Sequence, residues 1–423
     1  MRQLEHGYES PRWSGEITDC SMPMTFDTYS ICSFNCLYCF AFFQKAFTSK
    51  GYLDRRVRSV NVDFVKRLFT DSLTGKKTNQ FTNYIQNKVT MQWGGMADGF
   101  DEYEKRFGVS LELLKFFDMI DYPLSISTKG TWFTKDSRYM NLIAKHAHNW
   151  HFKISIITAD FMKAKAIERG VDSPQERLEA IKRLADLGIH VTLRLRPYII
   201  GISDDYKKLI SLAKEAGADS VTTEFFCLET RADERLRKKY DEISKYAGFD
   251  IYEFYRKHSK GSGYRRLNYK IKAGIIENMK ATAHKFGLRF YVSDAHHKEK
   301  CDYACCCGTP PEFKVSLGHY GQALQIAKSR TNGLVYWKDI ADDLNKYVGD
   351  ILFYNAIGFN TQSNRVRAQR KNQTLYELVQ EYWNTTSSAK SPAKYFDGVL
   401  IPIGLDDDKN VVYQLKEKLC NAL

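Results

Sequence analysis

The hydrophobic and polar positions of the chain switch between two periods over most of its length. Six short runs are rich in β-branched and aromatic residues and end in turn residues, which is typical of strands. The segments between them repeat apolar residues every three or four positions, as one face of a helix does. The six predicted strands are residues 24–31, 88–93, 123–128, 152–158, 190–196 and 220–227.

The clearest predicted helix covers residues 173–188. Ser173 is its expected N-cap and forms a capping box with Glu176. Pro174 occupies the first turn, and Gly188 is the expected stop. Comparable patterns occupy residues 110–120, 203–217 and 271–287, and a strand-like run at 289–294 follows the last of them.

Strands that alternate with helices predict a parallel sheet, and right-handed crossovers curl such a sheet into a full or partial barrel. We therefore expect an α/β fold, a partial (β/α)6 barrel of TIM-like form, over residues 24–300. An N-terminal segment, 1–23, precedes it. A C-terminal extension, 301–423, follows it and loses the alternation, although its basic stretch 364–383 has a helical pattern.

The composition favours a folded protein and leaves its partner open. Hydrophobic residues make up 43% of the 423 residues and aromatic residues 14%, which is enough for a large core. We expect a soluble, cytoplasmic protein without membrane association, because no apolar run has transmembrane length and the N-terminus is polar. The net charge of +13 favours a polyanion such as nucleic acid, or reflects a lysine-rich surface.

Three of the ten cysteines lie close together in the sequence CSFNCLYC, as Cys32, Cys36 and Cys39. Clustered cysteines in a reducing compartment are usually metal ligands or catalytic thiols. Three ligands without a fourth favour an iron–sulfur cubane with one open iron, which can chelate the amine and carboxylate of S-adenosylmethionine. An electron passed into the sulfonium then releases a 5′-deoxyadenosyl radical. The alternative is a zinc site whose fourth ligand is Cys20 or a distant histidine.

Polar and glycine residues follow the predicted strands, where barrel enzymes carry their sites. The turn QWGGMAD, residues 92–98, comes directly after the second strand, and glycines there let the backbone approach a ligand closely. The polar candidates at strand ends are Asp98, Thr128, Lys129, Ser155, Thr158, Arg194, Arg196, Glu224 and Cys227. Thr128 and Thr158 are equally explained by hydrogen bonds to the local backbone.

The spacing of CSFNCLYC, with Tyr38 before its last cysteine, resembles that of radical S-adenosylmethionine (radical SAM) enzymes. Together with GGMAD, STKG, the 173–201 segment and the late CCCG, it resembles the spore photoproduct lyase-like branch, also called DNA repair photolyases. The resemblance implies a [4Fe–4S] cluster on Cys32, Cys36 and Cys39. It also implies an S-adenosylmethionine site formed by Tyr38, Gly94, Gly95, Asp98, Lys129, Ser155 and Arg177.

The same resemblance implies roles for several of these residues. Asp98 is expected near the methionyl end of the cofactor, Lys129 on its carboxylate, and Ser155 at its ribose or carboxylate region. Arg177 either reaches a carboxylate or remains a solvated helical arginine. The lyases carry a hydrogen-donor cysteine at the position of Gly95, so we expect another reaction here. Cys227 is the candidate catalytic thiol that replaces it, or is a small buried hydrophobe.

A second group, CDYACCCG at 301–308, holds Cys301, Cys305, Cys306 and Cys307. We expect two or three of them, Cys301 and Cys305 first, to ligate a second iron–sulfur cluster or zinc, because adjacent side chains diverge. Alternatively they are a redox or substrate-binding thiol set, or a brace for the open side of the barrel. The upstream His296 and His297 either add a ligand or cap the preceding strand.

Three functions compete. The first is a radical SAM enzyme that abstracts hydrogen from a nucleic acid or nucleobase and is reduced by a flavodoxin- or ferredoxin-type partner. The second is radical modification of a ribosomal peptide or small metabolite with an auxiliary cluster. The third is a zinc-stapled nucleic-acid-binding protein without catalysis. The basic stretch forms either a solvated helix or a basic and aromatic face for phosphates. The residues of that face are Arg365, Arg367, Arg370, Lys371, Tyr376 and Trp383.

Overall fold

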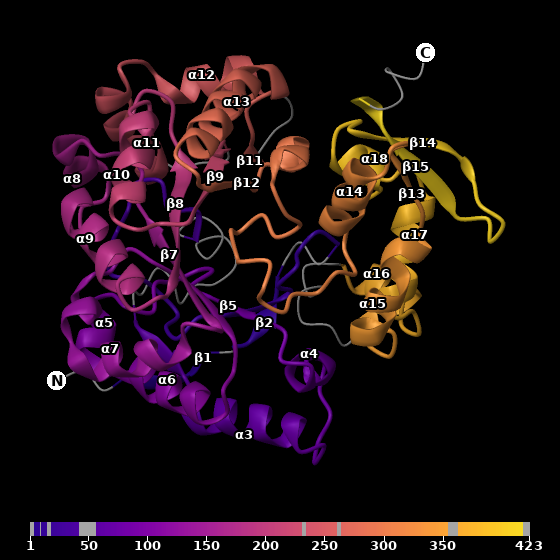
Figure 1. Ribbon diagram of the computed structural model, residues 1–423, viewed down its shortest axis with the longest axis horizontal. Helices are drawn as coiled ribbons and strands as arrows, with labels where there is room; N and C mark the ends of the chain where they lie inside the picture. The colour runs from indigo at the N-terminus through magenta and orange to yellow at the C-terminus, as the bar shows by residue number, and fades with distance from the viewer. Residues whose placement is uncertain are drawn as a thin grey trace.

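The structure is a computed structural model, and its largest element is a central sheet of eight strands (Figure 1). The described residues are 4–8, 10–14, 18–41, 56–230, 234–259, 264–353 and 363–417. The strands of the sheet, in spatial order, are β12 (Arg289–Val292), β9 (Ser220–Phe225), β8 (His190–Tyr198), β7 (Trp150–Ser155), β6 (Leu124–Thr128), β5 (Met91–Trp93), β3 (Met24–Phe26) and β2 (Arg12–Trp13).

Seven of these strands are parallel and lie side by side in chain order, from β3 to β12, while β2 runs antiparallel to β3. All six predicted strands are present, and β12 adds a seventh parallel strand from the run at 289–294. The edge strands β2 and β12 are not paired with each other in the described part of the chain. The predicted α/β partial barrel is therefore confirmed, and it is open.

Helices cover the outer face of this sheet, as α9 and α10 do beside β7 and β8 in Figure 1. The helices between β4 and the end of the barrel are α3 (Val62–Leu73), α4 (Thr82–Gln86), α5 (Glu102–Phe107), α6 (Val109–Met119), α7 (Ser137–Ile143), α8 (Phe161–Ile167), α9 (Pro174–Ala185), α10 (Tyr206–Glu215), α11 (Glu234–Ala247), α12 (Ile251–His258) and α13 (Tyr269–Lys285). The capping box predicted for α9 is present, because Ser173 and Glu176 exchange side chain-to-backbone hydrogen bonds.

Several short elements connect the larger ones. Three are 3-10 helices, η1 (Trp132–Lys135), η2 (Ala144–His146) and η3 (Ala295–Lys300). Two small ladders pair β1 (Glu5–Tyr8) with β4 (Arg58–Val60), and β10 (Leu228–Glu229) with β11 (Tyr264–Arg265).

The two faces of the sheet differ in chemistry, and β8 shows the pattern. Val191, Leu193 and Leu195 are fully buried, as is usual for side chains that pack against outer helices. The alternate residues, Thr192 and Arg194, point to the inner face, because successive side chains of a strand point to opposite sides. The inner face is polar on the neighbouring strands too, so the interior of the barrel is lined by hydrogen-bonding and charged groups.

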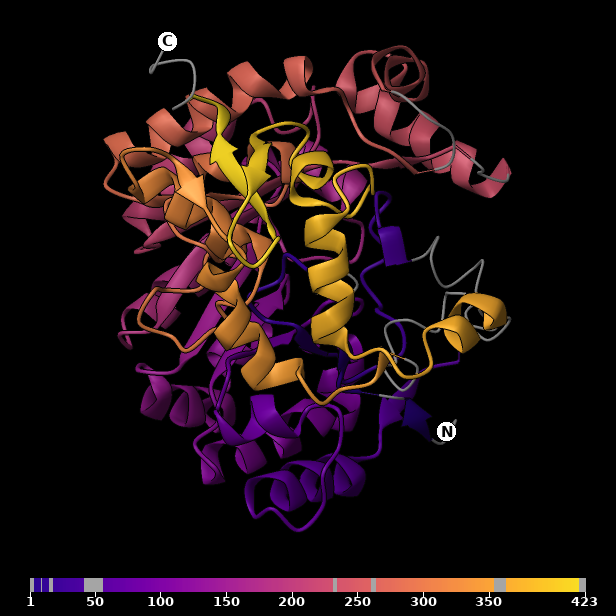
Figure 2. The same cartoon turned by 90° about the vertical axis from the view of Figure 1, so that its right-hand side faces the viewer.

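The C-terminal extension lies against one side of the barrel (Figures 1 and 2). It consists of α14 (Tyr320–Ser329), α15 (Lys338–Val348), α16 (Asn364–Gln369), α17 (Leu375–Asn384), α18 (Pro392–Tyr395) and an antiparallel sheet of β13 (Leu334–Val335), β15 (Val411–Leu415) and β14 (Leu400–Leu405). Tyr347 of α15 stacks on Tyr84 of α4 with ring centroids 4.6 Å apart. The domain boundaries at 23/24 and 300/301 stay a prediction.

The basic stretch 364–383 is two helices, α16 and α17, instead of one, because a second capping box, Thr374 with Glu377, starts a new helix. One member of the predicted basic and aromatic face, Trp383, lies in the core, and the rest of the face stays a prediction. Trp383 is fully buried, and its indole N–H donates to the Val411 carbonyl at 2.7 Å. Arg370 pairs with Glu381 at 2.7 Å, and the Arg367 side chain lies outside the described residues.

Within the described residues, no helix combines the length and the apolar character needed to cross a membrane.

Candidate active site

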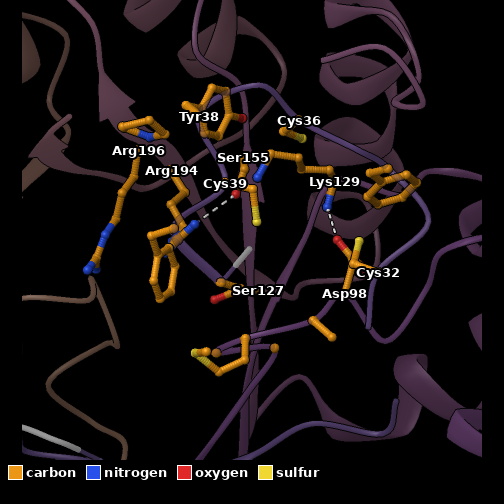
Figure 3. Close-up of a pocket in the computed structure, with 18 of the residues that line it drawn as sticks. Cys32, Cys36, Tyr38, Cys39, Asp98, Ser127, Lys129, Ser155, Arg194 and Arg196 are labelled. Atoms are coloured by element: carbon orange, nitrogen blue, oxygen red, sulfur yellow. Dashed lines mark hydrogen bonds between the residues drawn. The ribbon is translucent and has the colours of Figure 1, made fainter. Parts of the chain in front are cut away.

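The loop that carries Cys32, Cys36 and Cys39 follows β3 and is anchored at several points. The Tyr29 hydroxyl donates to Glu104 at 2.6 Å, and the Ser33 N–H donates to Asp101 at 2.6 Å. Farther along, the Leu37 N–H donates to the Ile167 carbonyl, and the Gly170 N–H to the Phe34 carbonyl. These bonds fix the loop so that all three cysteines line one cavity (Figure 3).

Glu104 is a buried anchor that sequence reasoning did not single out. Its carboxylate accepts hydrogen bonds from the Tyr29 and Tyr139 hydroxyls, each at 2.6 Å. It also accepts from the N–H groups of Ser110 and Leu111 at the start of α6, at 2.7 and 2.8 Å. Burial still raises the pKa of the Glu104 carboxyl above its usual value. One carboxylate thus joins the cysteine loop to two helices.

The glycine turn after β5 requires glycine, because of its backbone conformation and its close approach to the backbone of β6. Gly94 has φ +87°, and a Cβ there would lie 2.4 Å from the Ser127 carbonyl oxygen. Asp27 holds the turn from beneath, because one of its oxygens accepts from the N–H groups of Met96 and Ala97 at 2.8 and 3.1 Å. Its other oxygen pairs with Arg12 at 2.7 Å. Asp27 was also missed, although an acidic residue inside the predicted strand 24–31 was a usable signal.

The cavity has a volume of about 430 Å³ and opens at the carboxyl ends of the strands. It brings together all but one of the site residues predicted for the first cluster, the cofactor and catalysis, namely Cys32, Cys36, Cys39, Tyr38, Gly94, Gly95, Asp98, Lys129, Ser155 and Cys227. Among the described residues, its wall carries five cationic side chains and two carboxylates. The cations are Lys129, Arg194, Arg196, Lys239 and Arg266, and the carboxylates are Asp98 and Glu224.

Asp98 and Lys129 form a connected unit on the cavity wall. The Asp98 carboxylate accepts from the Thr128 hydroxyl at 2.7 Å. It also accepts from the Lys129 backbone N–H at 2.7 Å (Figure 3). Burial raises the pKa of Asp98 in spite of these bonds. The Lys129 ammonium lies 5.6 Å from the centre of the Tyr38 ring. Asp98 therefore fixes the backbone from which Lys129 extends.

Hydrogen bonds to the local backbone were an alternative explanation for Thr128 and Thr158, and both residues make such a bond. Thr128 donates to Asp98 and accepts from the Gly130 N–H at 2.9 Å. Thr158 accepts from the Asp160 N–H at 3.1 Å and donates to Asp205 at 3.0 Å.

Arg177 lies behind the cavity wall and does not line it. Its guanidinium is fully buried, donates to the Ser155 carbonyl at 2.7 Å and pairs with Glu168 at 2.7 Å. Glu168 in turn accepts the hydroxyl of Tyr38. Arg177 therefore reaches a buried carboxylate of the protein itself. Its burial excludes the alternative that it is a solvated helical arginine.

Two arginines of β8 point into the cavity. Arg194 donates to the Ser155 hydroxyl at 3.3 Å, and burial lowers its pKa to about 10 (Figure 3). Arg196 pairs with Glu224 and donates to the Ser293 hydroxyl at 3.1 Å.

Cys227 lies on the wall at the end of β9 and is almost fully buried. Burial raises the pKa of its thiol to about 12, and the thiol also hydrogen-bonds with Tyr264. The sulfur therefore keeps its proton near neutral pH.

The second cysteine group divides into two parts. Cys301 is a core residue, because its sulfur lies 3.2 Å from the Val292 N–H nitrogen and 3.3 Å from the Val292 carbonyl oxygen. Cys305, Cys306 and Cys307 lie in a turn that crosses the inner face of the sheet. The thiol of Cys307 hydrogen-bonds to that of Cys305 and lowers its pKa to about 7.

The two histidines upstream of this group have other neighbours. His297 stacks on Tyr269 with ring centroids 4.3 Å apart, and burial lowers its pKa to about 4. His296 lies 3.3 Å from a carboxylate oxygen of Asp397.

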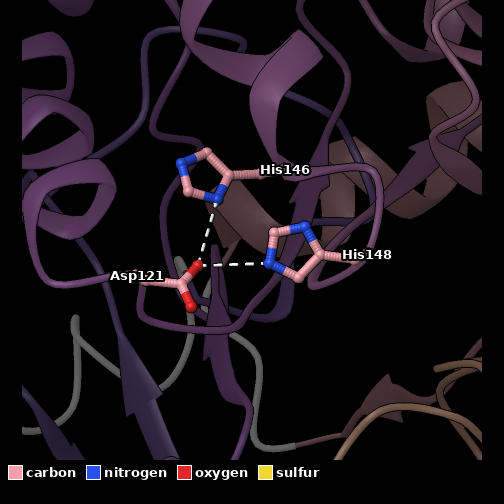
Figure 4. A group of neighbouring side chains, drawn as sticks. All are labelled: Asp121, His146 and His148. Carbon is pink, nitrogen blue, oxygen red and sulfur yellow. Dashed lines mark hydrogen bonds and ion pairs between the residues drawn. The ribbon is translucent and has the colours of Figure 1, made fainter.

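A different trio lies before β6 and β7, at the opposite ends of the strands (Figure 4). Asp121, His146 and His148 have ligand atoms within 4.8 Å of one another, and in the described ranges no other trio of histidine, cysteine or carboxylate side chains does. The His146 Nε2 is engaged by Asp118 at 2.9 Å, and its ring stacks on Trp150. The trio is not connected to the cavity described above.

The donor set of the cavity fits an iron–sulfur cluster and a nucleotide cofactor. Burial raises the pKa of Cys36 to about 12, so a thiolate there needs a cation such as a metal ion beside it. The Ser127 hydroxyl is buried on the wall without a hydrogen-bond partner in the described part of the chain. The close Gly94 turn adds a backbone edge that a ligand can approach.

Comparisons with known sequences agree with this donor set. Residues 27–213 match the sequence model of the radical SAM superfamily. Uncharacterized proteins of Mycobacterium tuberculosis and Mycobacterium bovis are 25% identical over 242 residues, which is 52% of this chain. The chain covers 66% of the length of these relatives, just under two thirds.

Solved structures show a partial likeness in fold. A spore photoproduct lyase mutant has a TM-score of 0.49 at 16% identity, over 68% of this chain and 81% of that chain. SuiB of Streptococcus suis, bound to its precursor peptide, has a TM-score of 0.35 at 13% identity, over 65% of this chain and 58% of that chain.

Proposed function

We propose that this chain, whose residues 27–213 match the sequence model of the radical SAM superfamily, is a radical SAM enzyme acting on a nucleic acid or nucleobase. The observation that carries the proposal is the convergence of Cys32, Cys36 and Cys39 on one cavity with the Gly94 turn. When bound, a [4Fe–4S] cluster and S-adenosylmethionine supply a 5′-deoxyadenosyl radical that abstracts hydrogen from the substrate.

The residues of the cavity divide the work of holding these groups. The three cysteines hold the cluster as thiolates, and Gly94 and Gly95 present backbone to the methionyl end of the cofactor. Lys129 neutralises the cofactor carboxylate, for which an ammonium is a compact partner. Asp98 holds the backbone of Lys129 in place. Ser155 contacts the ribose or carboxylate region from a position fixed by Arg194.

A set of buried groups braces the wall from behind. Arg177 holds Glu168, which accepts the Tyr38 hydroxyl and so orients the tyrosine beside the cluster loop. Because these groups are buried, the wall keeps water away from a reactive radical.

Cys227 is the proposed hydrogen donor to the product radical. Its position on the cavity wall gives it access to the substrate, and its raised pKa keeps the S–H bond intact at neutral pH. It stands in for the cysteine that the resemblance places at Gly95.

The substrate class is supported by the charges and rings around the cavity. Five cations against two carboxylates favour an anionic substrate, and the aromatic side chains offer surfaces on which a base can stack. The aromatic lining residues are Phe34, Tyr38, Phe40, Tyr103, Phe225, Phe226 and Tyr264. A one-electron donor of flavodoxin or ferredoxin type is the reducing partner that this chemistry requires.

A second candidate is a peptide or small metabolite. It is favoured by the cavity volume of about 430 Å³, which lies in the usual range for small-molecule sites. Oligonucleotide binding that weakens steeply with added salt supports the first candidate, and its absence supports the second.

The deciding experiment is anaerobic reconstitution with iron and sulfide, followed by dithionite and S-adenosylmethionine. Formation of 5′-deoxyadenosine is expected, and deuterium transfer into it from labelled oligonucleotides or peptides identifies the substrate. A protein that holds zinc without iron and sulfide would instead be a zinc-stapled binding module, and the proposal would fail. The Cys36→Ser variant is the matched negative control.

A further inference from the structure

Four thiols from two separate segments gather inside the barrel beneath the cavity. Three belong to the turn Cys305–Cys307, and the fourth is Cys20, which precedes the first strand of the barrel. The Cys307 thiol interacts with the other two, because it lowers the pKa of Cys305 and raises that of Cys306. Cys20 interacts electrostatically with Cys306 and Cys307.

Hydrogen bonds from three strands hold the turn against the inner face of the sheet. The Thr222 hydroxyl of β9 donates to the Cys306 carbonyl at 2.8 Å. The Thr192 hydroxyl of β8 donates to the Gly308 carbonyl at 3.1 Å, and the Ser125 hydroxyl of β6 lies 3.2 Å from that of Thr309. Residues two apart on a strand share a face about 7 Å apart. Thr192 and Thr222 therefore lie one residue layer below Arg194 and Glu224 of the cavity.

The segment around Cys20 lies against the same part of the chain. The Ser316 N–H donates to the Ser21 carbonyl at 2.9 Å, and the Tyr320 N–H to the Thr18 carbonyl at 2.8 Å. The Thr309 hydroxyl contacts the Met22 sulfur at 3.4 Å. The segment 18–22 is therefore held against residues 309–320, which follow the turn, and the Cys20 thiol donates to the Met22 carbonyl at 3.1 Å.

Polar atoms around the thiols are left without partners. The ammonium of Lys153 on β7 is 1% exposed, faces Cys305 and Cys307, and has no hydrogen-bond partner in the described ranges. The Tyr291 hydroxyl on β12 is also buried and unpartnered. The next charged groups on this side are Arg194 and Arg196. A buried cation without a counter-charge is costly, so this region favours an anionic occupant.

We propose that Cys20, Cys305, Cys306 and Cys307 hold a second iron–sulfur cluster in the barrel interior, with Lys153 as its neutralising cation. Cluster thiolates are anionic, which explains the unpartnered ammonium. The expected ligand Cys301 is replaced by Cys20, because the Cys301 sulfur faces the Val292 backbone. A cluster here lies one residue layer below the cavity that receives the substrate.

A zinc ion on the same thiolates is the alternative occupant of this site. The metal and sulfide content of the reconstituted chain separates the two, because only a cluster contains iron and sulfide.

The test uses the full chain, reconstituted anaerobically, with the first cluster removed by Cys32→Ser, Cys36→Ser and Cys39→Ser together. This triple variant is expected to keep about four iron and four sulfide per chain with a reducible cluster signal in electron paramagnetic resonance. Adding Cys306→Ser and Cys307→Ser is expected to remove them, whereas adding Cys301→Ser leaves them in place. Thermal melts identify any variant that fails to fold, and Cys20→Ser is then the milder replacement.

Three results would each overturn the inference. They are a triple variant without iron, a chain that holds zinc in place of iron, and iron that survives the loss of Cys306 and Cys307. None of these results depends on 5′-deoxyadenosine formation by the wild-type protein, so the two proposals fail separately. Lys153→Met adds a finer check, because loss of a nearby positive charge is expected to make the midpoint potential of this cluster more negative.

Discussion

Gly94 and Cys227 show how single residues set what the cavity can do. The first lets the backbone of one strand end approach the next strand, since a Cβ would overlap the Ser127 carbonyl. The second places a protonated sulfur on the cavity wall. Gly94 acts through its missing side chain and Cys227 through its S–H bond, so each role can be tested by one substitution.

Gly94→Ala is expected to weaken S-adenosylmethionine binding by about 10- to 100-fold, because overpacking costs about 1–3 kcal/mol. Equilibrium binding to the reconstituted protein measures the change. Gly75→Ala is the matched control, since Gly75 also has positive φ but no atom lies within 4 Å of the added Cβ. Equal affinity in the two variants would show that the turn does not contact the cofactor.

Cys227→Ala is expected to separate cofactor cleavage from product formation. With the hydrogen donor removed, product should fall while 5′-deoxyadenosine formation stays within about twofold of wild type. In D2O the wild-type product should carry one solvent-derived deuterium, because thiol protons exchange with water. Unchanged product yield from the variant would assign Cys227 to the core alone.

At the scale of elements, two buried carboxylates join the loops of the site to the scaffold. Asp27 ties the glycine turn to the end of β3, and Glu104 ties the cysteine loop to α6 and α7. A buried carboxylate that accepts several hydrogen bonds gives each loop one position. The loops are therefore as rigid as the elements that hold them.

Glu104→Gln is expected to lower the free energy of unfolding by about 1–3 kcal/mol, because an amide cannot accept all four hydrogen bonds. Urea unfolding of the protein without cofactors measures it. Glu112→Gln on α6 is the control, since Glu112 is exposed and pairs only with Lys66 in the described structure. A loss no larger than that of the control would mean that Glu104 does not anchor the loop.

At the scale of the whole molecule, a polar interior runs through an open parallel sheet. Its upper end is the cavity and its lower end receives the turn of the extension. Outside this interior, charged pairs at the amino ends of the strands connect neighbours in the sheet. His190 of β8 pairs with Asp219, which precedes β9, at 2.6 Å, and Arg289 of β12 reaches the same carboxylate at 3.1 Å.

The His190 pair makes stability depend on pH. The hydrogen bond to Asp219 raises the pKa of His190 above its usual 6.5. Its contribution is therefore fully present below pH 6.5 and is lost as the pH rises through the raised value. The melting temperature of wild type should exceed that of His190→Gln more at about pH 6 than at about pH 9. A difference that is constant over this range would contradict the linkage.

The sequence by itself determined the order of strands, the first cysteine group and the glycine turn. These are local features, since hydrophobic periods, capping residues and ligand spacing are written in neighbouring positions. For that reason all six strands, the α9 capping box and the wall residues from Cys32 to Cys227 were found without coordinates.

Only the tertiary structure decided which distant residues meet. It placed Arg177 behind the wall on Glu168, buried Trp383, and turned Cys301 toward Val292 while bringing Cys20 to the later cysteines. It also revealed Asp27 and Glu104 as anchors. The physical reason is that burial and hydrogen-bond partners depend on contacts between segments tens to hundreds of residues apart, and no local pattern records them.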